Sequence, residues 1–134
     1  MIASVQEYES IISHDDPNVR RRAILEEADA GTWLALLDNR PDLSSEIAMN
    51  KLLPPPIVDQ LISSLCCRTR SLVAMKRSLS AEQFSRLASD EDESVRLLVV
   101  HNKKAPRAIL EQLSNDHSVM VSDAALRRLH ALTE

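Results

Sequence analysis

The chain repeats itself about every 24 to 26 residues, and this repeat limits the fold more than any other feature. The clearest pair of matching stretches is Ser45–Asn50 followed by Pro54, and Leu97–Asn102 followed by Pro106, two periods further on. A period of this length is typical of solenoids, in which no unit can bury its apolar side alone and each stacks on its neighbours. The repeat therefore predicts a solenoid and makes a binding scaffold the default function.

The composition predicts that the repeating unit is helical. The chain holds one Gly and three aromatic residues, Tyr8, Trp33 and Phe84. Sheets favour aromatic and β-branched residues and need Gly-rich turns, so this composition argues against a β fold. Ala, Leu, Glu, Arg and Ser dominate instead, which suits helices. We expect an all-α solenoid of about five units, each with two helical segments.

Apolar positions define one helix in each unit. The equivalent anchor positions are Val19, Leu43, Thr69, Val95 and Val119. Four residues after each anchor stand Ala23, Ile47, Val73, Val99 and Asp123, and the residues that follow these are Ile24, Ala48, Ala74, Val100 and Ala124. Apolar residues at i, i+4 and i+5 lie on one side of a helix. The last unit departs from the pattern at Asp123, as expected for a terminal unit that faces water.

Capping residues predict where the helices begin. Three residues before the anchors stand Asp16, Arg40, Cys66, Asp92 and Asp116, of which the three Asp residues are good N-caps. A shorter segment forms the second half of each unit, and its equivalent starting positions are Ala30, Pro54, Ser80 and Pro106. Ser80 and Gln83 have the spacing of a capping box. At six to nine residues, this second segment fits either a short α-helix or a 3₁₀ turn.

The register divides the chain, which by its length is a single domain, into consecutive units. They are an N-terminal cap at 1–14 with a helix at 3–14, units at about 15–39, 40–64, 65–90 and 91–115, and a C-terminal cap unit at 116–134. The last helix, at 117–133, carries Leu126, Leu129 and Leu132, which we expect to close the core.

The best unit, residues 92 to 119, resembles a known repeat. Asp92, Val95-Arg96, Val99-Val100, Asn102, Pro106, Leu110, Leu113 and Asp116 look like the unit of the variant leucine-rich repeat family, within the HEAT-like helical repeat superfamily. The resemblance covers residues 15 to about 130 and implies a right-handed superhelix that pairs an α-helix with a shorter, often 3₁₀, helix. A founding type of that family carries an iron–sulfur cluster on a separate Cys-rich segment. This chain has no such segment, so we expect no cofactor.

A basic column forms the first candidate site. Aligned positions after each first helix are Glu27, Lys51, Arg77, Lys103 and Arg127, with Lys76, Lys104 and Arg128 beside them. Because stacked helices lie about 10 Å apart, these cations would form a positive stripe for an acidic protein or a phosphate backbone. The alternative interpretation is that they only complement the helix dipoles.

An apolar column forms the second candidate site. Leu25, Met49, Met75 and His101 occupy equivalent positions. Met is common at adaptable binding surfaces, which favours a contact with a partner. Ordinary packing between neighbouring units is the alternative, and solvent exposure of Met49 and Met75 would favour the binding interpretation.

Two further patterns have structural interpretations first. Arg20, Arg70 and Arg96 follow the anchors and predict exposed i,i+4 ion pairs with Asp16 and Asp92, together with bonds between units. Cys66 stands at a helix start, beside Cys67, Arg68 and Arg70. Such a site lowers the pKa of a thiol, although two inert thiols are the simpler interpretation. Neither these cysteines nor the scattered histidines His14, His101, His117 and His130 have metal-ligand spacing.

No enzyme motif stands out, because the one glycine, Gly31, excludes Gly-rich phosphate loops. The run Asp90–Glu93 predicts a solvated loop with a helix cap. We expect a non-catalytic scaffold for protein–protein interaction in the cytoplasm, whose partner is another protein with an acidic surface. The formal net charge of −4 argues against nucleic acid, and no apolar run is long enough for a membrane span. The alternatives are a nucleic-acid-binding HEAT-like protein, and an enzyme or accessory subunit of one; an exposed apolar end could also form a homodimer.

Overall fold

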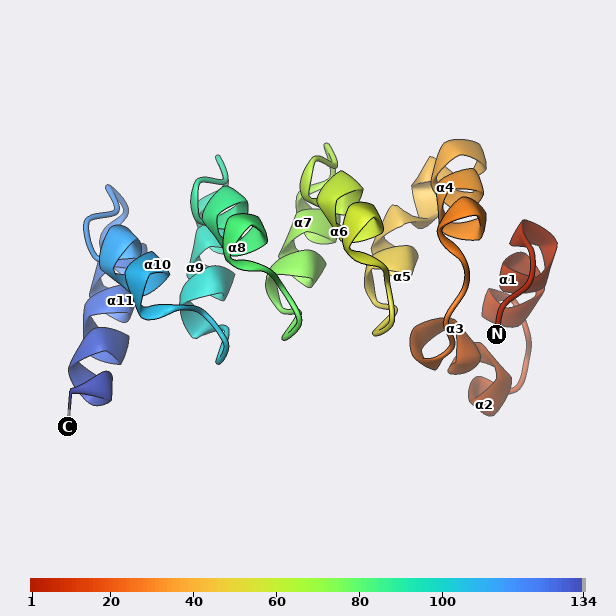
Figure 1. The fold of residues 1–134 in the computed structure, drawn as a ribbon, viewed down its shortest axis with the longest axis horizontal. Helices are drawn as coiled ribbons and strands as arrows, with labels where there is room; N and C mark the ends of the chain where they lie inside the picture. Colours follow the sequence, from red (N-terminus) through yellow and green to blue (C-terminus); the bar gives the residue numbers. More distant parts are fainter. Residues whose placement is uncertain (134) are drawn as a thin grey trace. The chain divides into compact units, whose positions relative to one another are not determined.

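The structure, a computed structural model, describes residues 1–133. Helices and connecting segments account for all of these residues, and none of them lies in a strand, as Figure 1 shows. This confirms the prediction of an all-α protein. Backbone contacts divide the chain into two compact units, Met1–Thr69 and the part from Arg70 onward, which we call unit 1 and unit 2. Each unit is described by itself.

Capping residues and prolines begin the helices of unit 1. They are α1 (Val5–Ile12), α2 (Pro17–Arg20), α3 (Arg22–Leu25), α4 (Ala30–Asn39), the 3₁₀ helix η1 (Pro41–Leu43), α5 (Ser44–Ala48) and α6 (Pro55–Ile62). Asp16 caps α2 by accepting a hydrogen bond from the N–H of Asn18, and Pro17 takes the first helical position. The predicted N-terminal helix is present as α1, with Ser4 as its N-cap.

Unit 2 begins within α7 (Cys67–Ala74) and continues with α8 (Ala81–Ala88), α9 (Glu93–His101), α10 (Arg107–Leu113) and α11 (Val119–Leu132). In Figure 1, α8 and α10 lie side by side, as do α9 and α11. Asp92 caps α9, and Ser80 and Gln83 form the predicted capping box at the start of α8. Buried aliphatic side chains from Val95, Val99 and Leu110 build the core between these helices.

The second segment of each repeat is α-helical, which decides between the two forms that the sequence left open. The segments are α4, α6, α8 and α10, and the one 3₁₀ helix among the described residues is η1. The predicted start at Ala30 is wrong by one residue, because Asp29 is the N-cap of α4 and accepts a hydrogen bond from the N–H of Thr32. Counting from Asp29, the buried pair is Trp33 and Leu36, in place of Leu37.

The predicted register of the last sequence repeat, which contains α11 of unit 2, is wrong by two residues. The sequence predicts Val119 as the apolar anchor, but Val119 is 71% exposed, whereas Val121 is fully buried. The N-cap of α11 is Ser118, and Asp116 lies two residues earlier, where its carboxylate accepts the backbone N–H of Ser118. The step from Val95 to Val121 is therefore 26 residues, the same as the step that precedes it.

The corrected register changes which residues of α11 reach the core. Val121 and Ala125 are the buried side chains of this helix. Leu126 and Leu132 are exposed, contrary to the expectation that they close the core, and Leu129 is half-buried. The prediction for these leucines depends on Val119 as the anchor. An anchor two residues too early turns the predicted buried face of the helix by about 200° from the observed buried face.

The arginines that follow the anchors make buried ion pairs of longer range than predicted. Arg70 donates to Asp90 at 2.8 Å, and Arg96 donates to Asp116 at the same distance. The pairs span 20 residues, so the prediction of i,i+4 pairs is wrong, whereas the pair of Arg96 with Asp116 is a predicted bond between repeats. All four side chains are more than nine-tenths buried, so the prediction of a solvated loop is wrong at Asp90. Arg20 makes hydrogen bonds to the backbone carbonyls of His14 and Asp15 instead of an ion pair with Asp16.

Candidate interaction surface

Buried amide side chains connect the ends of successive first helices. In unit 2, Asn102 is buried after the end of α9, and its Nδ2 donates to the carbonyl oxygens of Ala74 at 2.8 Å and Lys76 at 2.7 Å. Its Oδ1 accepts the backbone N–H of Lys104 at 2.9 Å. We call this arrangement the helix-end link. All the hydrogen-bonding groups of the Asn102 side chain are used within the fold.

The same link recurs at two other places. In unit 1, Asn50 donates to the carbonyls of Ala23 at 2.9 Å and Glu26 at 2.7 Å. In unit 2, Arg128 takes the place of the asparagine 26 residues after Asn102, and its guanidinium donates to the carbonyls of Val100 at 2.6 Å and Asn102 at 2.7 Å. The links in unit 2 therefore hold the ends of α7 and α9 and the middle of α11 in one row.

Exposed cations lie along this row, and we call the three stretches of chain that carry them the basic edge. The exposed cations are Arg77 after α7, Lys103 and Lys104 after α9, and Arg127 on α11. Among the described residues, none of the four has a carboxylate oxygen within the 4.0 Å of an ion pair. Three stretches make up the edge, at 75–80, 101–107 and 126–133, and they contain seven Lys and Arg residues but no Asp or Glu.

Two predicted members of the basic column have structural surroundings instead. Arg128 is half-buried and forms a helix-end link, as described above. Lys76 is also half-buried, and burial lowers the pKa of its ammonium to about 8. Near neutral pH, a fraction of the Lys76 side chains is therefore uncharged.

In unit 1, the predicted basic column consists of Glu27 and Lys51. Lys51 is exposed and its backbone N–H donates to the carbonyl of Ile24 at 2.8 Å. The segment that it contacts in this way contains Glu26, Glu27 and Asp29 and no cation. Lys51 therefore has carboxylates near the residue that it contacts, and one of these, Glu26, is paired with Arg22 and the N-terminal ammonium.

The predicted apolar column is exposed in both units. In unit 1, Leu25 and Met49 are 48% and 43% exposed, and in unit 2, Met75 is 59% exposed. His101, the fourth member, is exposed at the end of α9. The exposure of Met49 and Met75 favours contact with a partner over ordinary packing between neighbouring repeats. Within unit 2, Met75 and His101 lie next to the cations of the basic edge.

Cys66 lies at the start of α7 and has several hydrogen-bond donors around it. The N–H and hydroxyl of Thr69, the hydroxyl of Ser45 and the N–H of Arg68 lower the pKa of its thiol to about 7. The Ser45 Oγ lies 3.9 Å from its sulfur. The lowered pKa agrees with the prediction, although its cause is these donors and not the charges of neighbouring arginines. Cys66 is exposed, and Cys67 is half-buried.

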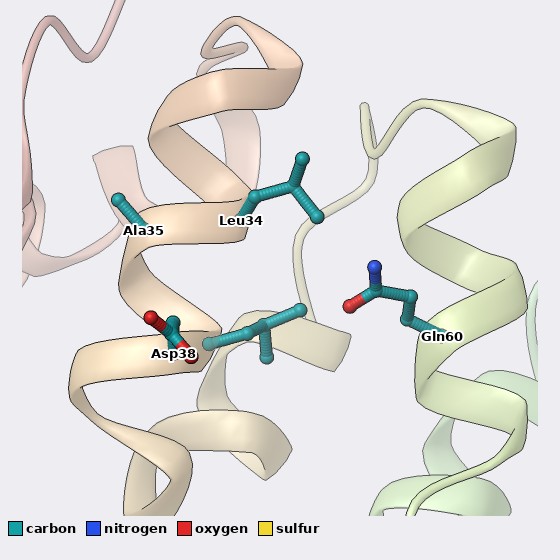
Figure 2. A pocket seen from close by; sticks show the side chains of 5 residues that line it. Leu34, Ala35, Asp38 and Gln60 are labelled. Atoms are coloured by element: carbon teal, nitrogen blue, oxygen red, sulfur yellow. The ribbon is translucent and has the colours of Figure 1, made fainter.

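A hollow of about 430 Å³ lies between α4 and α6 in unit 1. Leu34, Ala35, Leu37, Asp38 and Gln60 line it. Figure 2 shows Leu34 and Gln60 extending toward each other across it. Its polar lining consists of the Asp38 carboxylate and the Gln60 amide.

The part of the chain that the structure describes contains neither a metal-binding cluster nor a membrane-spanning helix. No cluster of three or more His, Cys, Asp or Glu side chains there could hold a metal ion. None of the described helices is long and apolar enough to cross a membrane. No protein-family model, curated protein or solved structure matches the chain.

Sequence reasoning missed the residues that make the helix-end link. Asn50 and Asn102 are identical residues 52 positions apart, and their match is part of the evidence for the repeat. A polar residue that recurs at the end of an apolar helical segment is a sign of a buried hydrogen-bonding role, because burial is costly for a polar group without a partner. Arg128 could not be found in this way, since its side chain differs and the register of the last unit was shifted.

Proposed function

We propose that this chain is a non-catalytic scaffold for protein–protein interaction, and that unit 2 contacts the partner through the basic edge. The proposal includes the solenoid of about five HEAT-like or variant leucine-rich units, in which equivalent residues of successive repeats form one continuous surface. It also includes a cytoplasmic location, because the two cysteines are free thiols.

One observation carries the proposal. Arg77, Lys103, Lys104 and Arg127 are exposed without an ion-pair partner among the described residues, and the helix-end links hold them in a row. Cations at helix C-termini gain some stability from the helix dipole, but this effect is confined to the last turn, and Arg127 lies five residues before the end of α11. A row of exposed cations beside Met75 and His101 is better suited to an acidic, partly apolar protein surface.

The aromatic residues argue for a protein partner over single-stranded nucleic acid. Tyr8, Trp33 and Phe84 are all buried, and the ring of Trp33 meets that of Tyr8 edge to face with their centroids 5.7 Å apart. Proteins that grip single strands stack the bases on exposed aromatic rings. None of the Phe, Tyr and Trp side chains of this sequence is exposed for that role.

Photocrosslinking from two matched serines tests the proposal. Ser78 lies in the basic edge before α8, and Ser89 follows α8, so a helix of eight residues, about 12 Å long, separates them. Each serine is replaced by a photoreactive amino acid, and cells that naturally make the protein are irradiated. We expect one protein adduct of defined mass from position 78 and little from position 89. Equal adducts from both positions, or adducts removed by nucleases, would contradict the proposal.

A further inference from the structure

The spacing of the basic edge contains information about the shape of its ligand. In each helix-end link, one side chain donates to two carbonyls at the end of the preceding first helix, at 2.6 to 2.8 Å. Adjacent helices held in this way pack about 8–10 Å apart. Arg77, then Lys103 with Lys104, then Arg127 therefore form three rows of positive charge at intervals of about one helix spacing.

An extended chain in the polyproline II form has a matching period. This helix has three residues per turn and rises about 3.1 Å per residue, so every third side chain points the same way about 9 Å further on. Carboxylates at every third residue would thus meet successive rows of the basic edge. In a β-strand, side chains three residues apart point to opposite faces, so a strand does not present its carboxylates in this way.

We propose that the basic edge of unit 2 binds an extended acidic segment of a partner protein, with Asp or Glu at every third residue. This inference rests on the proposed function and names the chemistry of the partner. Charge complementarity selects the acidic side chains, since the three stretches of the edge contain no Asp or Glu. Met75 and His101 then lie beside the bound chain and contact the residues between its carboxylates.

A helical acidic segment matches the same distance less well. Carboxylates seven residues apart on a helix are separated by about 10.5 Å on one face, so their charges would also be in register. A docked helix, however, places an apolar stripe in a hydrophobic groove. The exposed large apolar residues of the edge lie on its outer rows, namely Met75, Leu126 and Leu132, and the middle row presents His101, Lys103 and Lys104. An apolar stripe would therefore lie against charge at its centre.

The test is an NMR titration of the full chain with peptides of equal charge. The first peptide repeats Glu-Pro-Ala four times, and the second has the same composition with its four Glu residues in one block. A longer helical peptide places four Glu residues seven apart, and a short DNA duplex serves as a phosphate probe. We expect the spaced peptide to bind about tenfold more tightly than the block peptide at low salt, as three exposed ion pairs in register allow.

Charge reversal locates the binding. The double variant Arg77→Glu, Lys103→Glu should lose about tenfold or more in affinity for the spaced peptide, because two attractive rows become repulsive. Each single variant, Arg77→Glu or Lys103→Glu, is compared with Lys51→Glu in unit 1, which changes the net charge by the same amount and should bind as the unaltered protein does. All of these side chains are exposed, so the melting temperature should stay nearly constant.

Each other outcome removes the inference in its own way. Equal affinity for the spaced and block peptides would refute the three-residue period and leave the scaffold role intact. Preference for the helical peptide would refute the extended conformation. Tighter binding of the DNA duplex would refute a protein partner altogether, together with the proposed function. Absence of binding to every peptide at low salt would refute the acidic ligand, whereas the crosslinking from Ser78 would still report on a partner of other chemistry.

Discussion

Replacement of Asn102 by alanine should destabilise unit 2 by about 3 kcal/mol. Ala74 has no exposed surface, so its carbonyl would lose the amide donor without gaining water, at a cost of ~1–3 kcal/mol. The carbonyl of Lys76 and the N–H of Lys104 belong to residues with solvent access, and each would cost about 0.5–1 kcal/mol after rehydration.

Urea unfolding followed by circular dichroism measures this loss. The matched control is Asn115→Ala, because Asn115 is exposed and its amide reaches only the carbonyl of Glu111, at 3.4 Å. We expect the control to change the free energy of unfolding by less than about 0.5 kcal/mol. Hydrogen exchange should also quicken at the ends of α7 and α9 in the Asn102 variant. If both variants unfold at the same urea concentration, the helix-end link contributes no stability and the reasoning fails.

Three further changes test other parts of the structure. Tyr8→Phe should raise the free energy of unfolding by about 1 kcal/mol in a urea titration, because the buried Tyr8 hydroxyl has no hydrogen-bond partner among the described residues; a large loss would show that it has one. Asp116→Asn should cost about 3 kcal/mol at pH 7 by leaving Arg96 buried without its counter-charge. Burial would raise the pKa of Asp116, but hydrogen bonds from Arg96 and the Ser118 N–H lower it overall from 3.8. The contribution of Asp116 to the free energy of unfolding is therefore complete above about pH 4 and is lost as the pH falls further. The melting temperature of the variant should thus fall less steeply with acid than that of the parent, and an equally steep fall would contradict the ion pair. Alkylation of Cys66 in a Cys67→Ser background should reach half its maximal rate near pH 7, and Ser45→Ala should move that midpoint upward; a midpoint near 9 in the parent would refute the lowered pKa.

Local signals in the sequence predicted the helices well. The caps Asp16, Asp92 and Ser80 work through hydrogen bonds to residues two or three positions away, so the sequence itself contains both partners. The buried anchors Thr69 and Val95 follow from helical periodicity for the same reason. These features depend on neighbours along the chain, which explains why they could be predicted.

Features that depend on distant partners could not be predicted in the same way. The pairing of Arg96 with Asp116 spans 20 residues, and nothing in the sequence distinguishes Asp116 from the nearer Asp92 as its partner. The register of the last unit failed because Asp116 and Ser118 are both good caps, and only the burial of Val121 decides between them. For the candidate site, the exposed cations were predicted, but the loss of Lys76 and Arg128 from that set depends on their burial.

The helix-end links have a consequence for how such a surface can change over evolutionary time. They end on main-chain carbonyls, which every amino acid possesses, and not on particular side chains of the neighbouring repeat. Substitution of Arg77 or Lys103 therefore leaves the hydrogen bonds beside them intact. New recognition properties can accordingly arise one exposed residue at a time, and protein engineers can graft other contact residues onto the same positions without redesigning the framework.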